Sequence, residues 1–260
     1  MRHSEAIALA YFVYLAAAAF VRPLSAGRRA FVWASTAAVV AIELSRPTTA
    51  LHIRDWLPAV VILLAYFASG AFYVAPSRRV EAWLADWDRR LLGDVTFDRC
   101  PALLRVYLDI VYDITFVLVP AAFAVLLWTG HAAMTDRFWT IVSLAEFIPF
   151  ATLPWMQARP PWAIEPPRPA DATSVRRFSL YFVDHMSIRA NTFPSGHASA
   201  TAAVALALWP ASGVAAAIFA VLSLSIAVGS VVGRFHYAID AITGLLLAIG
   251  IWAIVAVLAP

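Results

Sequence analysis

Residues 213–232 read GVAAAIFAVLSLSIAVGSVV and contain no charged side chain. An α-helix needs about 20 apolar residues to cross the hydrocarbon core of a bilayer. The whole chain has the same character, because 62% of its 260 residues are hydrophobic and only 13% are charged. Soluble domains carry roughly 25% charged residues. The composition therefore predicts a chain whose solvent is mostly lipid.

Further apolar runs are separated by charged or proline-rich segments, at 6–21, 30–44, 57–75, 106–129, 137–155, 197–209 and 241–258. We expect an all-α polytopic transmembrane helical bundle with a six-helix core and about two N-terminal helices. The N-terminal extension would cover residues 1–56, and the core residues 57–260. The first run could also be a signal peptide, but further spans follow it, and we expect a retained helix.

Two polar segments interrupt this pattern. Near 76–103, Trp83, Leu84, Trp87 and Leu91 recur at helical spacing between charged residues, which predicts an amphipathic helix at the membrane interface. Such a helix could guide a lipid substrate into the protein, or it could serve only as an anchor at the membrane surface. Residues 156–196 are the longest polar stretch, and we expect a long loop there. Its prolines are Pro160, Pro161, Pro166, Pro167 and Pro169.

The basic residues and the cysteine exclude several kinds of chemistry. All 19 basic residues are arginine, so no mechanism that requires a lysine is open to this chain. The single cysteine, Cys100, excludes an intrachain disulfide and a cysteine-based metal cluster. The sequence has no tract rich in basic residues, so nothing in it indicates a nucleic-acid partner.

Three short polar segments stand out, with the sequences QARPP at 157–161, NTFPSGH at 191–197 and GRFHYAID at 233–240. A chain that leaves His197, crosses the membrane and returns to Arg234 brings the second and third segments to one face. The first segment joins them because only a loop separates it from His197. Polar residues gathered at one depth of an apolar chain are functional candidates.

The first two segments suit an anion. Ser195 and Gly196 precede an apolar run, so backbone N–H groups, a hydroxyl and the positive end of a helix dipole would face the ligand. Arg159 can pair with two phosphate oxygens through its forked guanidinium.

The third segment suits nucleophilic catalysis. His236 and Asp240 are four residues apart, on one helical face. The carboxylate can hold one imidazole nitrogen as a donor and leave the other nitrogen free to attack. His197 would then protonate the leaving oxygen.

The order and spacing of these segments resemble the type-2 phosphatidic acid phosphatase superfamily, which also includes vanadium haloperoxidases. Its pattern is K-x6-R-P, then P-S-G-H, then S-R-x5-H-x3-D, and the resemblance covers roughly residues 57–258. It implies that His236 is the nucleophile of a phosphohistidine mechanism, that Asp240 orients it and that His197 is the general acid. It also implies that the phosphatase members use no metal or other cofactor.

Two positions depart from the pattern, with Thr152 in place of the lysine and Ser230 in place of the arginine. Arg234 is a candidate replacement, as are Arg189 and Arg105, and Ser230 itself could bind phosphate. Each cation on a transferring phosphoryl group contributes about 3–4 kcal/mol. A site that lacks two cations suits a phosphodiester better than a phosphomonoester. This sequence is also similar to the inositol phosphorylceramide synthase and sphingomyelin synthase branches.

Three acidic residues, Asp109, Asp113 and Glu146, lie inside apolar runs. The two aspartates could be paired charges at a helix end or could support a headgroup site. We expect Glu146 to be protonated or hydrogen-bonded to a neighbouring helix.

We therefore expect a membrane lipid phosphatase or phosphotransferase that acts on a phosphorylated lipid. The alternatives are a headgroup transferase on phosphodiester lipids and a catalytically silent lipid-binding membrane protein; a small-solute transporter is less well supported. The expected partners are a lipid substrate and the membrane, with the oligomeric state left open. We expect an integral protein of a bacterial inner (plasma) membrane. The arginines near the reactive face favour the cytoplasmic side, but the family resemblance implies the external side, which we expect.

Overall fold

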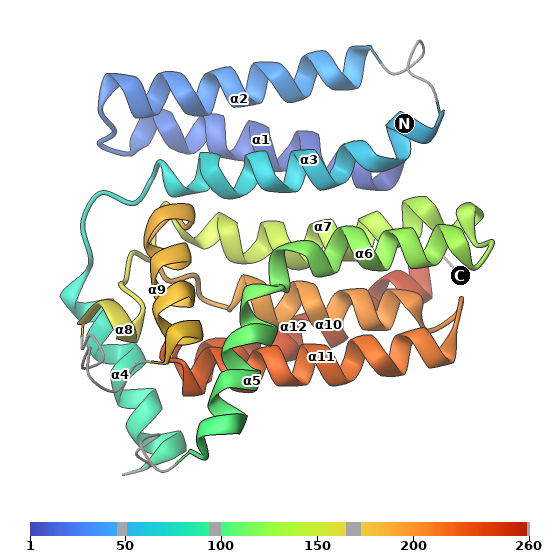
Figure 1. Ribbon diagram of the computed structural model, residues 1–260. Helices are drawn as coiled ribbons and strands as arrows, with labels where there is room; N and C mark the ends of the chain where they lie inside the picture. Colours follow the sequence, from blue (N-terminus) through green and yellow to red (C-terminus); the bar gives the residue numbers. More distant parts are fainter. Residues whose placement is uncertain (46–50, 94–99, 165–172, 259–260) are drawn as a thin grey trace.

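The computed structural model describes residues 1–45, 51–93, 100–164 and 173–258, and within them the regular secondary structure consists of helices and one isolated bridge (Figure 1). The helices are α1 (His3–Val21), α2 (Ala26–Leu44), α3 (Leu51–Gly70), α4 (Arg78–Leu92), α5 (Ala102–Asp113), α6 (Thr115–Trp128), α7 (Thr135–Thr152), α8 (Pro161–Ile164), α9 (Ser174–Met186), α10 (Gly196–Leu208), α11 (Gly213–Val232) and α12 (Ala238–Leu258). The predicted all-α polytopic bundle is confirmed.

Four helices of the described chain are long and apolar enough to cross a membrane: α1, α3, α11 and α12. The bent pair of α5 and α6 adds a fifth span if it is counted as one, and α10 is apolar but short. Of the eight predicted spans, those at α2 and α7 are not in this group, because each helix carries three charged residues. The chain is an integral membrane protein, and its helices differ in length and in the number of charged residues they carry.

The predicted span over 106–129 is not one straight helix but the bent pair of α5 and α6. The chain bends by 64° between α5 and α6. The hydroxyl of Thr115 donates to the carbonyl of Tyr112 at 2.7 Å, a local bond that competes with the regular helix pattern. The bend allows α5 to pack against α9 and α11, while α6 packs against α7 and α10.

Helix α10 lies at the centre of the bundle and packs against α6, α7, α11 and α12 (Figure 1). It consists largely of alanine and other small residues, which allow helix backbones to approach closely. The approach is tightest at Gly244 of α12, where an added Cβ would lie 2.6 Å from the carbonyl oxygen of Ser195. Any larger side chain at this position would displace the start of α10.

The predicted amphipathic helix is confirmed as α4, and its place at the membrane interface stays a prediction. Leu84 is fully buried, and Trp83 meets the ring of Phe193 edge-on at 5.0 Å. Helix α4 packs against the first turns of α12. Helix α4 is therefore part of the packed structure, because it contacts the polar segments at 191–197 and 233–240 that were found in the sequence.

Residues 156–196 are not the long loop that the sequence predicts, because α8 and the 13-residue α9 lie within them. Thr173 caps α9 by accepting a hydrogen bond from the backbone N–H of Arg176 at 3.1 Å. Pro166, Pro167 and Pro169 lie outside the described residues.

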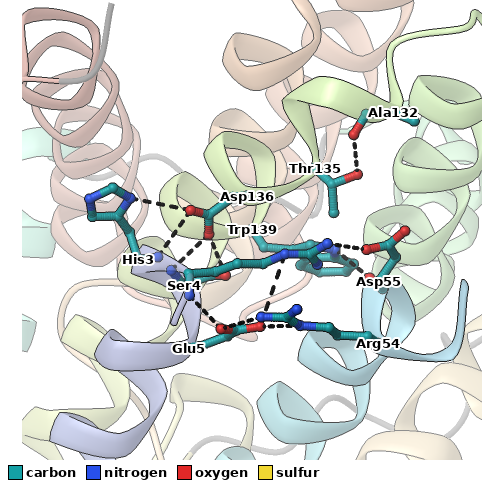
Figure 2. A network of polar contacts seen from close by, with 10 residues as sticks. His3, Ser4, Glu5, Arg54, Asp55, Ala132, Thr135, Asp136 and Trp139 are labelled. Atoms are coloured by element: carbon teal, nitrogen blue, oxygen red, sulfur yellow. Dashed lines mark hydrogen bonds and ion pairs between the residues drawn. The ribbon is translucent and has the colours of Figure 1, made fainter. Parts of the chain in front are cut away.

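A polar network at the end of the bundle opposite to α4 joins α1 and α3 to α7 (Figure 2). Asp136 accepts hydrogen bonds from the backbone N–H groups of His3 and Ser4, both at 3.0 Å, and from the Ser4 hydroxyl at 2.7 Å. Arg54 of α3 forms a two-point ion pair with Glu5 of α1, at 2.8 and 3.0 Å. These bonds fix the N-terminal helices on the rest of the bundle.

Replacing Asp136 with alanine should destabilise the protein. The change removes the acceptor of these three hydrogen bonds and of the contact with Nδ1 of His3 at 3.2 Å, and an unsatisfied buried donor costs about 1–3 kcal/mol. At this chain length that corresponds to a fall in Tm of at least about 2–4 °C, measured by thermal unfolding in detergent. Asp86→Ala is the control, since Asp86 pairs with the exposed Arg89 and Arg90 of its own helix, α4. Equal Tm values for the two variants would contradict this account of the network.

Candidate active site

The three polar segments found in the sequence lie against one another in the structure. Direct backbone hydrogen bonds join each segment to another one. They run from Asn191 N to the Ala158 carbonyl (2.8 Å) and from Ser195 N to the Asp240 carbonyl (2.9 Å), and Trp162 N, directly after the first segment, donates to the Arg234 carbonyl (2.8 Å). The segments therefore form one connected unit at the end of the bundle where α10 and α12 begin.

His197 and His236 are close neighbours in this unit. Their ring centroids are 5.5 Å apart, and the ring planes are inclined by 58°. His197 lies in the first turn of α10, and His236 lies in the turn between α11 and α12. The two imidazoles therefore lie side by side and can both face one bound group, and the catalytic roles of the two residues stay predictions.

Asp240 lies behind His236 and is fully buried. Its Oδ2 atom is 3.5 Å from Nδ1 of His236, which is long for a hydrogen bond. The same oxygen accepts from the Asn191 side-chain amide at 2.8 Å and from the Tyr237 backbone N–H at 3.0 Å. The carboxylate is thus held in place by two donors and faces the nitrogen of His236 that would not attack. Catalytic hydrogen bonds are often long in free enzymes and shorten when substrate binds.

The turn that carries His236 is fixed by the backbone. The carbonyl of Ser230 accepts from the N–H groups of both Phe235 (2.8 Å) and His236 (3.0 Å), and Arg234 adopts a positive φ of 61°. Asp88 of α4 caps α12, accepting from the N–H of Ala238 at 2.6 Å. Burial lowers the pKa of His236 to about 4. Burial therefore favours the neutral form of this ring, which keeps a lone pair for attack.

The residues predicted to bind phosphate already have hydrogen-bond partners inside the protein. The Ser195 hydroxyl accepts from Ala198 N at 3.3 Å, and Gly196 N donates to the Thr192 hydroxyl at 3.2 Å. These bonds shape the start of α10. Whether the same groups reach a bound phosphate stays a prediction.

Arg159 is joined to α4 by an ion pair. Its Nε and one terminal nitrogen donate to the two oxygens of Glu81, at 2.9 and 3.0 Å, and its backbone N–H also donates to Glu81. These hydrogen bonds lower the pKa of Glu81. The Arg159 side chain is 41% exposed, and Glu81 competes with any phosphate for the same guanidinium. The sequence did not indicate this acidic partner.

A cavity of about 410 Å³ opens beside the two histidines. Both His197 and His236 line it, together with mostly apolar side chains from α3, α6 and α7. Of the arginines in the described part of the chain, Arg189 alone lines this cavity. The volume and the apolar lining suit one end of a lipid next to a small polar region.

Comparison with known protein families agrees with this geometry. Residues 78–254 match the family model described as PAP2 superfamily. The chain belongs to the PAP2 superfamily. No curated protein and no solved structure matches the chain. The match contains all three polar segments and begins at α4, so it leaves α1–α3 outside.

The PAP2 match confirms the family resemblance drawn from the sequence. Closer kinship to the inositol phosphorylceramide synthase branch stays a prediction, as does a domain boundary between residues 56 and 57. Among the described residues, no group of three or more histidine, cysteine, aspartate and glutamate side chains is arranged to hold a metal ion.

The two departures from the PAP2 pattern have the same local structure. The Thr152 hydroxyl donates to the Pro149 carbonyl at 2.7 Å, and the Ser230 hydroxyl donates to the Ala227 carbonyl at 2.8 Å. Each short side chain is therefore hydrogen-bonded within its own helix, where the family pattern has a long cation. Ser230 contributes to the site through its carbonyl, which holds the turn before His236.

Arg176 is a buried arginine of α9, within the residues 156–196 that the sequence predicts to be a loop. Its guanidinium forms an ion pair with Asp109 at 3.0 Å and donates to the carbonyl of Gly233. It therefore connects α9 and α5 to the turn that leads to His236. One of the two interpretations of Asp109 was a paired charge, and the structure agrees with it. Its partner Arg176, however, comes from a segment that is distant in the sequence.

Aromatic stacking extends from Arg176 to the other histidine. The guanidinium lies 4.6 Å from the ring centre of Phe235, and that ring stacks on Tyr112 at 4.0 Å. Tyr112 in turn stacks on His197 at 5.2 Å. Arg176 is thus placed to position both imidazoles without touching either of them.

Proposed function

We propose that this PAP2 protein transfers the phospho group of a phosphorylated lipid through a phosphohistidine on His236. The main support is the pair of imidazole rings 5.5 Å apart at an apolar cavity, with the Asp240 carboxylate behind one of them. PAP2 membership supports a phosphatase-type lipid enzyme in general.

In the first step, Nε2 of His236 attacks phosphorus and forms a P–N bond. The bond between phosphorus and the lipid oxygen breaks, and protonated His197 gives its proton to that oxygen. Asp240 keeps Nδ1 of His236 as the proton-bearing nitrogen and stabilises the positive charge that develops on the ring. The Asn191 amide and the Tyr237 N–H hold the carboxylate in this orientation.

In the second step, water or an alcohol gives a proton to His197 and attacks phosphorus, and the P–N bond breaks. Water as acceptor makes the enzyme a phosphatase. A lipid alcohol as acceptor makes it a phosphotransferase. Both outcomes use the same two histidines.

A headgroup transferase that acts on phosphodiester lipids is the second candidate. Thr152 and Ser230 replace two cations, and Arg159 is shared with Glu81. A diester carries one negative charge instead of nearly two, so it needs fewer cations in the site. This balance of charge favours the diester, whereas the Pro194-Ser195-Gly196-His197 segment is typical of ordinary phosphatases.

The two candidates separate in one assay of the purified protein in detergent. The protein is given labelled phosphatidic acid, a prenyl diphosphate, or a phosphodiester lipid together with a lipid alcohol. Release of free phosphate supports the phosphatase, and a new phospholipid without phosphate release supports the transferase. A protein that binds lipid but turns over none of these substrates would contradict both candidates and favour the silent alternative.

We also propose that the site faces the external side of a bacterial inner membrane, as the family resemblance implies. In a Cys100→Ser background, Arg177→Cys on the exposed side of α9 should react with a membrane-impermeant thiol reagent added to intact spheroplasts. Reaction only after the membrane is disrupted would overturn this orientation.

Replacing Arg176 with lysine should lower kcat by about 10²-fold and change KM less than about threefold. A lysine cannot hold Asp109 and the Gly233 carbonyl together, and a displacement of about 1 Å at catalytic groups costs about this much. Steady-state kinetics on the best substrate check the result. Arg177→Lys, at the exposed neighbouring position, is the control. Equal kcat values for the two variants would contradict a positioning role for Arg176.

A further inference from the structure

Glu146 is an acidic residue of α7 that the mechanism above does not use. Its side chain lines the same cavity as His197 and His236. The sequence led us to expect either a protonated carboxyl group or a hydrogen bond with a neighbouring helix. Within the described parts of the chain, however, no hydrogen bond or ion pair joins the Glu146 carboxyl to another residue.

The carboxyl group lies close to the start of α10. The Ser199 hydroxyl donates to the carbonyl of Ala145, which holds α7 against the first turn of α10. A Cβ added at Gly196 would lie 3.4 Å from the Glu146 Oε2 atom. Gly196 directly precedes His197, so the carboxyl group is near the position where a lipid oxygen would leave phosphorus.

The surroundings of Glu146 are mostly apolar. The cavity around it is formed largely by aromatic and aliphatic side chains, including Phe116, Phe150 and Val119. Tyr66, a nearby polar group, accepts a hydrogen bond from Ile188 N at 3.0 Å. A carboxyl group in such a place is destabilising unless it is hydrogen-bonded. Ionisable residues retained at membrane depth usually face a cavity and serve a binding or transport role.

We propose that Glu146 is a specificity-determining residue that accepts a hydrogen bond from a hydroxyl or amino group of the lipid, a few atoms from the phosphorus. This inference rests on the proposed function and deepens it. The preferred lipid then carries a hydrogen-bond donor beside its phosphate, as lyso-glycerolipids and amino-alcohol lipids do. Simple prenyl phosphates lack this donor.

The test compares two substrates that differ in one hydroxyl group, an oleoyl lysophosphatidic acid and its 2-deoxy analogue. Charge and acyl chain are the same in both. A site built to bind a hydroxyl discriminates strongly against the analogue that lacks it. We expect the wild-type kcat/KM to be at least about tenfold higher for the hydroxyl-bearing lipid.

Glu146→Leu should bring this ratio close to one, mainly by lowering kcat/KM for the hydroxyl-bearing lipid. Glu146→Gln keeps a carbonyl acceptor and should preserve most of the preference, so it tests the proposal even if the leucine variant folds poorly. Glu43→Leu is the matched control, because it removes an acidic residue from α2, outside the cavity that holds the histidines.

Three results would overturn the inference: a wild-type ratio near one, a Glu146→Leu ratio equal to that of the wild type, or a Glu146→Gln ratio reduced as far as that of Glu146→Leu. In each of these cases the wild type still turns over phosphorylated lipids, and the proposed function stands. A wild type that turns over neither lipid, nor any lipid in the assay above, overturns the proposed function and this inference together.

Discussion

Replacing His236 with glutamine should lower kcat by at least about 10³-fold and leave the protein folded. Removal of a catalytic nucleophile costs this much or more in enzymes that form covalent intermediates. Glutamine keeps a polar side chain of similar length in the turn, and the bonds from the Ser230 carbonyl to the backbone of Phe235 and His236 remain. The measurement is turnover of the best lipid substrate, with Tm recorded in the same detergent.

The control for His236→Gln is His131→Gln, in the connection between α6 and α7. It should keep kcat within about twofold of the wild-type value, since the His131 side chain is hydrogen-bonded to Thr129 and does not line the cavity beside His197 and His236. If His236→Gln retained more than about a tenth of the activity, His236 would not be the nucleophile.

Replacing Asp240 with asparagine should lower kcat by roughly 10³-fold, the second largest effect we expect. An asparagine oxygen can still accept from the Asn191 amide and the Tyr237 N–H, so the local structure should survive. What is lost is the negative charge 3.5 Å from Nδ1 of His236, which stabilises the ring as it becomes positive. The preferred tautomer is lost with it.

The comparison for Asp240→Asn is Asp113→Asn, which also replaces a carboxylate in this half of the bundle. Asp113 accepts from the Ser179 hydroxyl at 2.7 Å and does not contact either histidine. Its variant should change kcat by less than about fivefold. Equal losses in the two variants would show that the effect of Asp240 is a general loss of structure and not a loss of catalysis.

The apolar runs predicted most of the fold because each is close to the length of its helix. The clearest example is 213–232, which coincides with α11. The same reasoning missed the bend at Ile114, because the long apolar run contains only the two polar residues Asp113 and Thr115 at that point. Two polar residues are too weak a signal to predict a bend, whereas the structure shows the Thr115 hydroxyl bonded to the Tyr112 carbonyl and α5 packed against α9. For α9 the sequence contains an N-cap residue, Thr173, but the polar composition of the segment led us to expect a loop.

The site was predictable where it depended on order along the chain. A helix that leaves His197 and one that returns to His236 must bring both residues to one face, and their rings are neighbours. The supporting residues were not predictable, because their partners are far away in sequence. Arg176 pairs with Asp109, and Arg159 pairs with Glu81 78 residues away. No spacing rule relates such positions, and only the packing of α4, α5 and α9 brings them together.

The most direct test of the central claim is a rapid quench in alkali during turnover, followed by mass spectrometry of the digested protein. Phosphohistidine survives alkali and is lost in acid, so the two quenches can be compared. The account predicts a phospho group on His236 in the alkaline quench, at Nε2, and none in the Asp240→Asn or His236→Gln variants at the same time point. A phospho group on any other residue, or full turnover with no covalent intermediate, would contradict it.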